Sequence, residues 1–368
     1  MRILHTENSC GWGGQEIRIL SEATGMMARG HLVHLVCPRE ARIYPEAMAR
    51  GLPVTALPIG RKNPRGLFAL RNWLRANPMD VINTHSSTDS WLAALACASL
   101  GRRPPIVRTR HISAPVPRNT ATRWLYGQAA RIVTTGEKLK SDLVATLGCD
   151  PARIVSIPTG IDTEVYRPPG PEGRAEARRG LGLPADAFVF GIVATLRSWK
   201  GHADLLEAFA RLQDPSALLL LVGGGPQQEN LERRIAELGL AGRALMPGNQ
   251  AEVLPWLHAL DVFALPSYAN EGVPQALMQA MLTGLPAVTT DIGGIPEVAM
   301  DGETALVVPP RDVAALSAAL ARLRADDALR ARLGEAARRH VAARHSRSLM
   351  LERMEDVFRE AVAGRPTR

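Results

Sequence analysis

Short runs of consecutive apolar residues alternate with helix-length amphipathic segments along the whole chain. The runs are rich in Val, Ile and Leu, which is typical of parallel strands covered by helices on both faces of a sheet. In the first half this pattern predicts strands at residues 2–6, 32–37, 54–58, 80–84, 106–110, 131–135 and 153–157. In the second half it predicts strands at 187–195, 217–222, 243–246, 261–265, 287–290 and 305–308. The alternation therefore predicts an α/β protein with two parallel sheets.

A break in the pattern separates the two sets of strands. Residues 166–173 contain three prolines and two glycines, so neither a helix nor a strand is expected to continue through them. A chain of 368 residues also has the length of two ordinary domains. We therefore predict two Rossmann-like domains, at residues 1–168 and 169–344, with a C-terminal helix at about 345–368 that packs back on the first domain.

Composition restricts the class of protein. Hydrophobic residues make up 46% of the chain and charged residues 22%, the mix of a globular protein. The longest apolar segment, Trp91–Leu100, is shorter than the roughly 18 residues that span a bilayer, and the strand pattern begins where a secretory signal would lie. The four cysteines form no Cys-x-x-Cys pair, which argues against a disulfide framework or a zinc site. We expect a cytoplasmic protein.

Positive charge is concentrated in the first half of the chain. The net charge is +8, and residues 1–168 carry 22 Lys and Arg against 12 Asp and Glu, whereas the remainder carries 22 against 24. This asymmetry favours an anionic partner for the first half, either a membrane surface or a phosphorylated acceptor. An Arg-rich proteome would produce the same surplus without any such partner.

The segment Arg61–Arg75 is a specific candidate for a membrane contact. Leu67, Leu70 and Leu74 fall on one helical face, and Arg71 flanks it. A basic amphipathic helix of this kind can lie in a lipid interface. The alternative is that the leucines pack under the sheet and the arginines are solvated.

Two glycine-rich turns follow predicted strands. The first, Cys10–Glu16, contains Gly13 and Gly14, and the second, Gly223–Pro226, contains Gly224. Glycines allow backbone amides to approach an anion at a helix N-terminus. Neither turn has the spaced glycines of a dinucleotide-binding fingerprint, and a tight turn without a ligand explains each one equally well.

The segment Pro266–Glu297 is more specific. Glu271 lies in a loop after a buried strand, and a helix is expected to start just after it, at Gly272, Val273 and Pro274. Gln279 lies about two helical turns further on. A carboxylate beside helix-start amides can hold sugar hydroxyls and a diphosphate together. An acidic residue that stabilises the helix dipole is the alternative interpretation.

This segment resembles the C-terminal signature of the family 4 retaining glycosyltransferases, which have the GT-B fold. Further stretches resemble the same family in order, namely Ile157–Asp162, Lys200-Gly201-His202, Gly223–Pro226 and Asp301–Pro310. The resemblance extends from about residue 2 to residue 320 and is strongest from residue 153 onward. It implies two Rossmann-like domains with parallel sheets that face a central donor cleft, and a nucleotide diphosphate sugar as donor.

The resemblance implies roles for several residues of the second domain. Glu271 would contact the hydroxyls of the donor sugar, and Lys200 would neutralise the diphosphate. The residues after the glutamate would help to hold sugar and phosphate, namely Gly272, Val273 and Pro274, and Gly224 would also contact the donor.

Two positions depart from the family pattern. The family arginine that accompanies the lysine falls at Thr195, and we expect Arg197 to take its place. The second glutamate of the family, which binds the ribose, is Gln279 here. An amide still offers one acceptor oxygen, so we expect Gln279 to bind the ribose.

In the first domain, the resemblance places Gly13 and Gly14 against the donor diphosphate and His111 in the pocket for donor sugar and acceptor. His85, at the end of another predicted strand, is a weaker candidate. The basic segment His111–Arg123 is the expected acceptor-binding loop.

The resemblance predicts a retaining glycosyltransferase that acts on a cell-envelope glycan, such as lipopolysaccharide, or on a lipid-linked acceptor. Retaining glycosidases use two carboxylates, whereas only Glu271 is well placed here, so we favour front-face substitution. The chain has no Asp-x-Asp motif, so we expect no metal, no cofactor beyond the donor and no nucleic-acid partner. The alternatives are a catalytically impaired sugar-nucleotide-binding protein, a sugar-nucleotide epimerase and, more distantly, a dinucleotide oxidoreductase.

Overall fold

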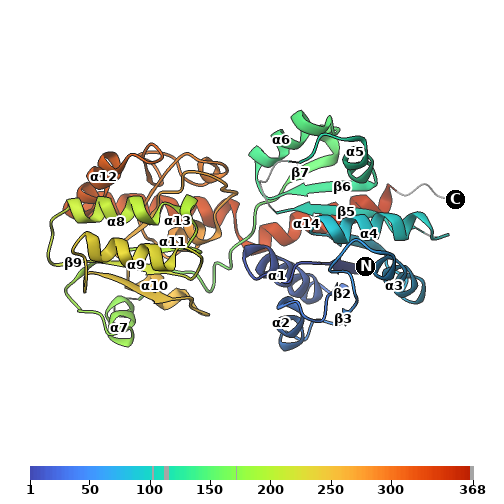
Figure 1. Cartoon of the computed structure of the whole chain (residues 1–368), viewed down its shortest axis with the longest axis horizontal. Coiled ribbons are helices and arrows are strands. Elements are labelled where there is room, and N and C mark those ends of the chain that lie inside the picture. The colour runs from blue at the N-terminus through green and yellow to red at the C-terminus, as the bar shows by residue number, and fades with distance from the viewer. Residues whose placement is uncertain (102, 112–115, 171, 365–368) are drawn as a thin grey trace. The chain divides into compact units, whose positions relative to one another are not determined.

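A computed structural model describes residues 1–101, 103–111, 116–170 and 172–364, which form two compact units (Figure 1). The N-terminal unit comprises Met1–Gly160 together with Ser348–Arg368, and the C-terminal unit comprises Ile161–Arg347. The change of unit therefore falls a few residues before the proline-rich segment at 166–173.

The N-terminal unit contains a seven-stranded sheet in the order β3-β2-β1-β4-β5-β6-β7, and every pair of neighbours is parallel. The strands are β1 (Arg2–Thr6), β2 (Leu32–Cys37), β3 (Val54–Ala56), β4 (Val81–Thr84), β5 (Ile106–Arg110), β6 (Ala129–Thr134) and β7 (Ile154–Ser156). Helices α1 to α6 belong to this unit, at Gly14–Ala28, Ile43–Ala49, Pro64–Ala76, Ser87–Ala98, Thr120–Gly127 and Glu137–Leu147.

The C-terminal unit contains a six-stranded parallel sheet in the order β10-β9-β8-β11-β12-β13. Its strands are β8 (Phe188–Val193), β9 (Ala217–Val222), β10 (Ala244–Gly248), β11 (Val262–Leu265), β12 (Ala287–Thr289) and β13 (Leu306–Val307). Helices α7 to α13 occupy Gly173–Gly180, His202–Arg211, Gln228–Glu237, Leu254–Ala259, Gln275–Leu282, Val313–Ala325 and Asp327–Arg344. The two parallel sheets confirm the predicted fold class, and a strand lies at each position that the apolar runs predicted.

The last helix, α14 (Arg347–Ala363), packs in the core of the N-terminal unit (Figure 1). Met354 and Phe358 are fully buried there with residues of β1, β2 and α1. Gly25 of α1 permits the close approach, since a Cβ atom at this position would lie 2.4 Å from a methyl carbon of Leu351.

Helix α3 does not present its leucines to solvent. Leu70 is fully buried and Leu74 is 5% exposed, and both belong to the core beneath α3 and α4. The expectation that this leucine face contacts lipid is therefore wrong, because the same side chains fill the core of the unit. In the part of the chain that the structure describes, no helix is both long and apolar enough to cross a membrane.

The strand order determines where ligands can bind. In each sheet the direction of winding reverses once, between β1 and β4 in the N-terminal unit and between β8 and β11 in the C-terminal unit. Ligands of open parallel sheets bind outside the carboxyl ends of the strands at such switch points. The loops after β1, β4, β8 and β11 are therefore the places where the sheets position functional side chains.

Candidate active site

The switch point of the C-terminal unit brings Lys200 and Glu271 together. The Lys200 Nζ donates to Glu271 Oε1 at 2.6 Å, and Ser267 Oγ donates to the same oxygen at 2.5 Å. The Glu271 side chain is 4% exposed and that of Lys200 is 20% exposed. The lysine lies in the turn after β8 and the glutamate in the loop after β11, so residues far apart in sequence form one partly buried ion pair. Because both donors use Oε1, the second carboxylate oxygen is left for other hydrogen-bond donors.

Glycines let these loops approach one another. Gly201, after the 3-10 turn Ser198–Lys200, has φ +76°, and a Cβ atom there would lie 2.1 Å from the carbonyl oxygen of Pro266. Gly293 has φ +64°, and its Cβ would lie 2.0 Å from the carbonyl oxygen of Glu271. Only glycine fits both the backbone conformation and the space at these positions. They therefore fix the Lys200 turn and the Glu271 loop.

The residues after Glu271 lead directly into α11. Gly272 is half-buried, Val273 is 8% exposed, and Pro274 is the N-cap residue of the helix. Gln279 lies within this helix and is half-buried, whereas its neighbours Met278 and Ala280 are fully buried. Its role in ribose binding stays a prediction.

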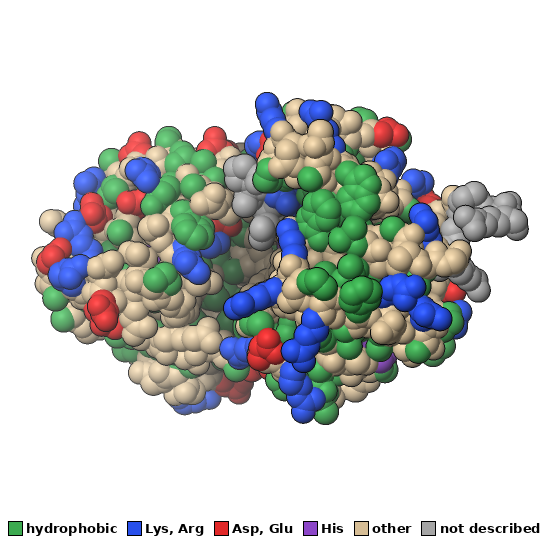
Figure 2. All heavy atoms as spheres, turned by 45° about the vertical axis from the view of Figure 1, so that its right-hand side comes forward, with side chains coloured by type: hydrophobic (Ala, Val, Ile, Leu, Met, Phe, Trp, Pro, Cys, Tyr) green, Lys and Arg blue, Asp and Glu red, His purple; other side chains and the backbone are tan. Residues whose placement is uncertain are grey.

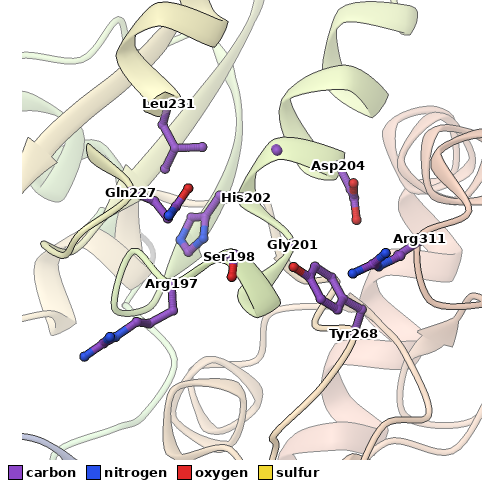
Figure 3. A pocket seen from close by; sticks show the side chains of 10 residues that line it. Arg197, Ser198, Gly201, His202, Asp204, Gln227, Leu231, Tyr268 and Arg311 are labelled. Carbon is purple, nitrogen blue, oxygen red and sulfur yellow. The ribbon is translucent and has the colours of Figure 1, made fainter. Parts of the chain in front are cut away.

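Arg197 begins the turn that carries Lys200, whose amide donates to the Arg197 carbonyl oxygen at 3.1 Å. The Arg197 side chain is exposed, and its guanidinium carbon lies 5.6 Å from the centre of the Trp199 ring. Arg197 lines a pocket of about 310 Å³ whose lining includes neither Lys200 nor Glu271. Figure 3 shows Arg197 pointing away from Tyr268 and Arg311, which line the same pocket. Thr195 is exposed on the same turn, and the substitution of Arg197 for the family arginine stays a prediction.

The Gly223–Pro226 turn has a packing role of its own. A Cβ atom on Gly223 would lie 2.0 Å from the carbonyl oxygen of Ala194, and Gly224 accepts a hydrogen bond from the Leu196 amide at 3.0 Å. The glycines thus let this turn lie against the segment that leaves β8, while Gly224 itself remains half-buried. The turn supports the loop that carries Arg197 and Lys200, and a contact from Gly224 to the donor stays a prediction.

In the N-terminal unit, the turn with Gly13 and Gly14 begins α1. Gly13 is the N-cap residue, and Gly14 is the first residue of the helix. Beside this turn lies the buried Glu7, which accepts hydrogen bonds from Ser86 Oγ at 2.7 Å and from the Gln15 side chain. Burial raises the pKa of Glu7, while the hydrogen bonds that its carboxylate accepts oppose this shift. A helix N-terminus is suited to bind an anion, and a contact from Gly13 or Gly14 to the donor diphosphate stays a prediction.

His111 follows β5 and is half-buried. Its Nε2 lies 2.9 Å from His85 Nδ1, and His85 Nε2 lies 2.9 Å from His5 Nδ1. The two candidate histidines are thus joined to a third that the sequence interpretation did not single out. In the expected acceptor loop His111–Arg123, residues 112–115 lie outside the described residues, and Asn119 caps α5 by accepting from the Thr122 amide at 2.8 Å.

Several further residues of these switch points were not predicted. Ser267 is buried and orients Glu271, and Glu7 and His5 lie at the carboxyl end of β1. A signal was present, because charged or polar residues rarely occupy a buried parallel strand or the positions just after it unless they have partners or a function. Within the described ranges, no group of three or more His, Cys, Asp or Glu residues is arranged to hold a metal ion.

Two family profiles together match most of the chain. The profile described as "Glycosyltransferase Family 4" matches residues 12–165, and the profile described as "Glycosyl transferases group 1" matches residues 173–340. The chain belongs to the family 4 retaining glycosyltransferases, and its two Rossmann-like units form the GT-B fold.

Two relatives and one solved structure show the range of similar proteins. The chain is 30% identical to a D-inositol 3-phosphate glycosyltransferase of Streptomyces bingchenggensis, over 77% of this chain and 67% of that protein. It is 31% identical to the GDP-mannose-dependent alpha-(1-6)-phosphatidylinositol monomannoside mannosyltransferase of Mycolicibacterium smegmatis, over 87% of this chain and 88% of that one. It matches the crystal structure of Anabaena HepE in complex with UDP-glucose with a TM-score of 0.85 at 20% identity, over 98% and 99% of the two chains.

Proposed function

We propose that this glycosyltransferase moves a sugar from a nucleotide diphosphate to a cell-envelope glycan or a lipid-linked acceptor, by metal-independent front-face substitution. The observation that carries the proposal is the buried ion pair between Lys200 and Glu271 at the switch point of the C-terminal sheet. It combines a cation for a diphosphate with a carboxylate for sugar hydroxyls.

In the proposed reaction, the bond between the anomeric carbon and the diphosphate oxygen breaks as the acceptor oxygen bonds to the same face of that carbon. The acceptor proton passes to the departing phosphate oxygen. Lys200 stabilises the charge that develops on the diphosphate, and Arg197 does so if it reaches the same group. Glu271 keeps one carboxylate oxygen on Lys200 and Ser267 and offers the other to the sugar. It orients the donor and does not need to form a covalent intermediate.

The chemical classes of donor and acceptor are supported by similar proteins. One relative is named as GDP-mannose-dependent and acts on a phosphatidylinositol mannoside, another acts on D-inositol 3-phosphate, and a structural neighbour holds UDP-glucose. A nucleotide diphosphate sugar is common to the named donors, and two acceptors carry phosphate. The basic N-terminal half is suited to such an acceptor.

The stereochemical part of the proposal is tested on the purified product. The anomeric proton coupling in its NMR spectrum should show the configuration of the donor sugar. An inverted anomeric centre would exclude the front-face mechanism.

Activity should persist in excess EDTA. The reason is that Lys200 and helix N-termini supply the positive charge that a divalent cation would otherwise bring to the diphosphate. The measurement is the initial rate of transfer with and without chelator, followed by addition of magnesium or manganese. Loss of the rate in EDTA and its recovery with metal would contradict the prediction.

Substitution Gln279→Ala should raise the Michaelis constant for donor by about fivefold, the effect of losing one hydrogen bond worth ~1 kcal/mol. The turnover number should change less, because a ribose contact stabilises ground and transition states alike. Steady-state kinetics with the donor varied provides the measurement, and Gln128→Ala, at an exposed position in the N-terminal unit, is the control. An unchanged donor constant would place Gln279 outside the ribose site.

We propose that the N-terminal unit also docks on an anionic membrane surface through a partly exposed stripe of apolar side chains. The stripe consists of Trp91 and Leu95 on α4, one turn apart, and Trp124 on α5, whose ring stacks on Trp91 with centroids 5.5 Å apart. Leu95 is 41% exposed and Trp124 39%. The Lys62 ammonium lies 5.6 Å from the Trp91 ring centre. Figure 2 shows Lys and Arg side chains around exposed hydrophobic side chains on this unit. Aromatic rings with flanking cations are typical of membrane-interface surfaces.

Vesicle co-sedimentation should show binding to anionic but not to neutral vesicles, and binding should weaken as salt shortens the screening length below roughly 8 Å. The double variant Leu95→Ala, Trp124→Ala should weaken binding by about tenfold or more. Each substitution removes apolar area that the membrane would bury, worth ~1.5–3 kcal/mol at most. Met48→Ala, at an exposed position of α2, is the matched control. Equal binding to neutral vesicles, or an unaffected double variant, would contradict this docking surface.

A further inference from the structure

Three imidazoles form a continuous chain in the N-terminal unit. They come from adjacent strands of the sheet, with His5 in β1, His85 just after β4 and His111 just after β5. The ring centroids of His5 and His85 are 5.2 Å apart with the rings nearly parallel, and those of His85 and His111 are 5.1 Å apart. His5 is fully buried, His85 is 4% exposed and His111 is half-buried. The three imidazoles therefore extend from the core of the unit to the end of β5.

Burial favours the neutral form of all three rings. Burial lowers the pKa of His5 to about 3 and lowers the pKa values of His85 and His111 well below their ordinary value. A neutral imidazole has one N–H and one bare nitrogen, so each contact in the chain needs a donor on one side and an acceptor on the other. Only two arrangements satisfy both contacts. Either every N–H points toward His111, or every N–H points toward His5.

The surroundings of His5, the buried end of the row of imidazoles, distinguish these two arrangements. Among the described residues, Nε2 of His5 is buried and has no hydrogen-bond partner, while the ring packs at 85° to that of Phe358. If the protons pointed toward His5, this nitrogen would carry an orphaned buried N–H, which native structures avoid more strictly than an unused acceptor. The favoured arrangement leaves His5 Nε2 bare, so that His5 Nδ1–H donates to His85 and His85 Nδ1–H donates to His111 Nε2. His111 must then carry its own proton on Nδ1.

We infer that His5 and His85 are positioning residues that fix His111 as a hydrogen-bond donor through Nδ1. The Nδ1–H group of His111 suits an oxygen atom of the transferred sugar or of the substrate that receives it. This assignment of the ligand rests on the proposed function. His111 could not act there as a proton acceptor without reversing both hydrogen bonds and burying an unpaired N–H at His5. Two side chains of the sheet, which need not touch substrate, thus determine which nitrogen of His111 carries the proton.

The tautomers can be read directly by long-range proton–nitrogen NMR of protein labelled with 15N-histidine. Each histidine signal is assigned from a variant in which that one histidine is replaced and its signal disappears. In the wild-type protein without ligand, His111 should show a protonated Nδ1 and a bare Nε2, and His5 a bare Nε2. A protonated Nε2 on either residue would overturn the inference. This measurement requires neither the nucleotide sugar nor the substrate that receives the sugar, so its result is independent of the proposed function.

A matched pair at position 85 separates positioning from a structural role. In His85→Asn the amide nitrogen occupies the place of Nδ1 and can still donate to His111, whereas in His85→Gln it occupies the place of Nε2 and cannot. His111 should keep its Nδ1 proton in His85→Asn and lose that preference in His85→Gln. The turnover number should fall by about 100-fold in His85→Gln, as for one lost preorganised donor, and stay within about threefold of wild type in His85→Asn. Equal tautomers and equal rates in the two variants would mean that His85 acts only through packing.

Discussion

Glu271→Ala and Lys200→Ala should each lower the turnover number by about 100-fold or more, the scale of removing one preorganised transition-state contact. Lys200 would no longer stabilise the departing diphosphate, and the sugar would lose its carboxylate partner. The measurement is steady-state transfer at saturating donor. Because each substitution also breaks a partly buried ion pair, thermal unfolding must accompany the kinetics.

Arg234→Ala is the matched control for this pair of substitutions. Arg234 forms an ion pair with Glu207 at 2.7 Å in the same unit, but both side chains are about one-third exposed. Its removal should leave turnover unchanged, since exposed pairs contribute little. A folded Lys200→Ala enzyme with near-normal turnover would contradict the assigned role. Arg197→Ala separates two possibilities, because a large loss would place its guanidinium at the diphosphate and a normal rate would assign that charge to Lys200 alone.

Gly293→Ala should lower turnover by about 100-fold, because displacing a reacting group by about 1 Å can have an effect of this size. The new Cβ would lie 2.0 Å from the carbonyl oxygen of Glu271, so the glutamate loop must move. Gly302→Ala is a close control, since its φ of +70° resembles the +64° of Gly293, while apart from its chain neighbours no described atom lies within 4 Å of its Cβ. Both variants place an alanine in the left-handed backbone region, which costs about 1–2 kcal/mol, but only Gly293→Ala displaces the loop that carries Glu271.

The comparison between the two glycine variants is made on turnover and on thermal unfolding together. Gly302→Ala should lose stability and keep its rate, whereas Gly293→Ala should lose both. If the two variants lost stability to the same extent and kept the same rate, the position of Glu271 would not depend on its contact with Gly293.

The fold was predictable because strands buried on both faces read as continuous apolar runs, as in Phe188–Val193 and Ala217–Val222. Strand ends were less well defined, and β6 begins at Ala129, two residues before the predicted start. The register shift between β5 and β6 lies near this point and has no counterpart in the apolar pattern. The leucines of α3 illustrate a different limit, because one amphipathic face suits a lipid surface and a protein core equally well.

The candidate site was predictable to the level of individual loops but not of contacts. Motif resemblance selected Lys200 and Glu271, whereas their hydrogen bond depends on tight approaches at Gly201 and Gly293 that spacing alone does not reveal. The imidazole chain was missed at His5 for a similar reason. Three strands that are neighbours in the sheet are separated in sequence, and only the strand order places their carboxyl ends side by side.

The Lys200–Glu271 pair is expected to bind a nucleotide diphosphate sugar and to promote its cleavage. The most direct test is the release of nucleoside diphosphate from a panel of UDP-, GDP-, ADP- and TDP-sugars, in the presence of EDTA, by the wild-type protein and by Lys200→Ala. We predict that the wild-type protein consumes at least one of these donors and that the folded variant does so about 100-fold more slowly. Consumption at the same rate by the variant, or of no donor by the wild-type protein, would contradict this role of the ion pair.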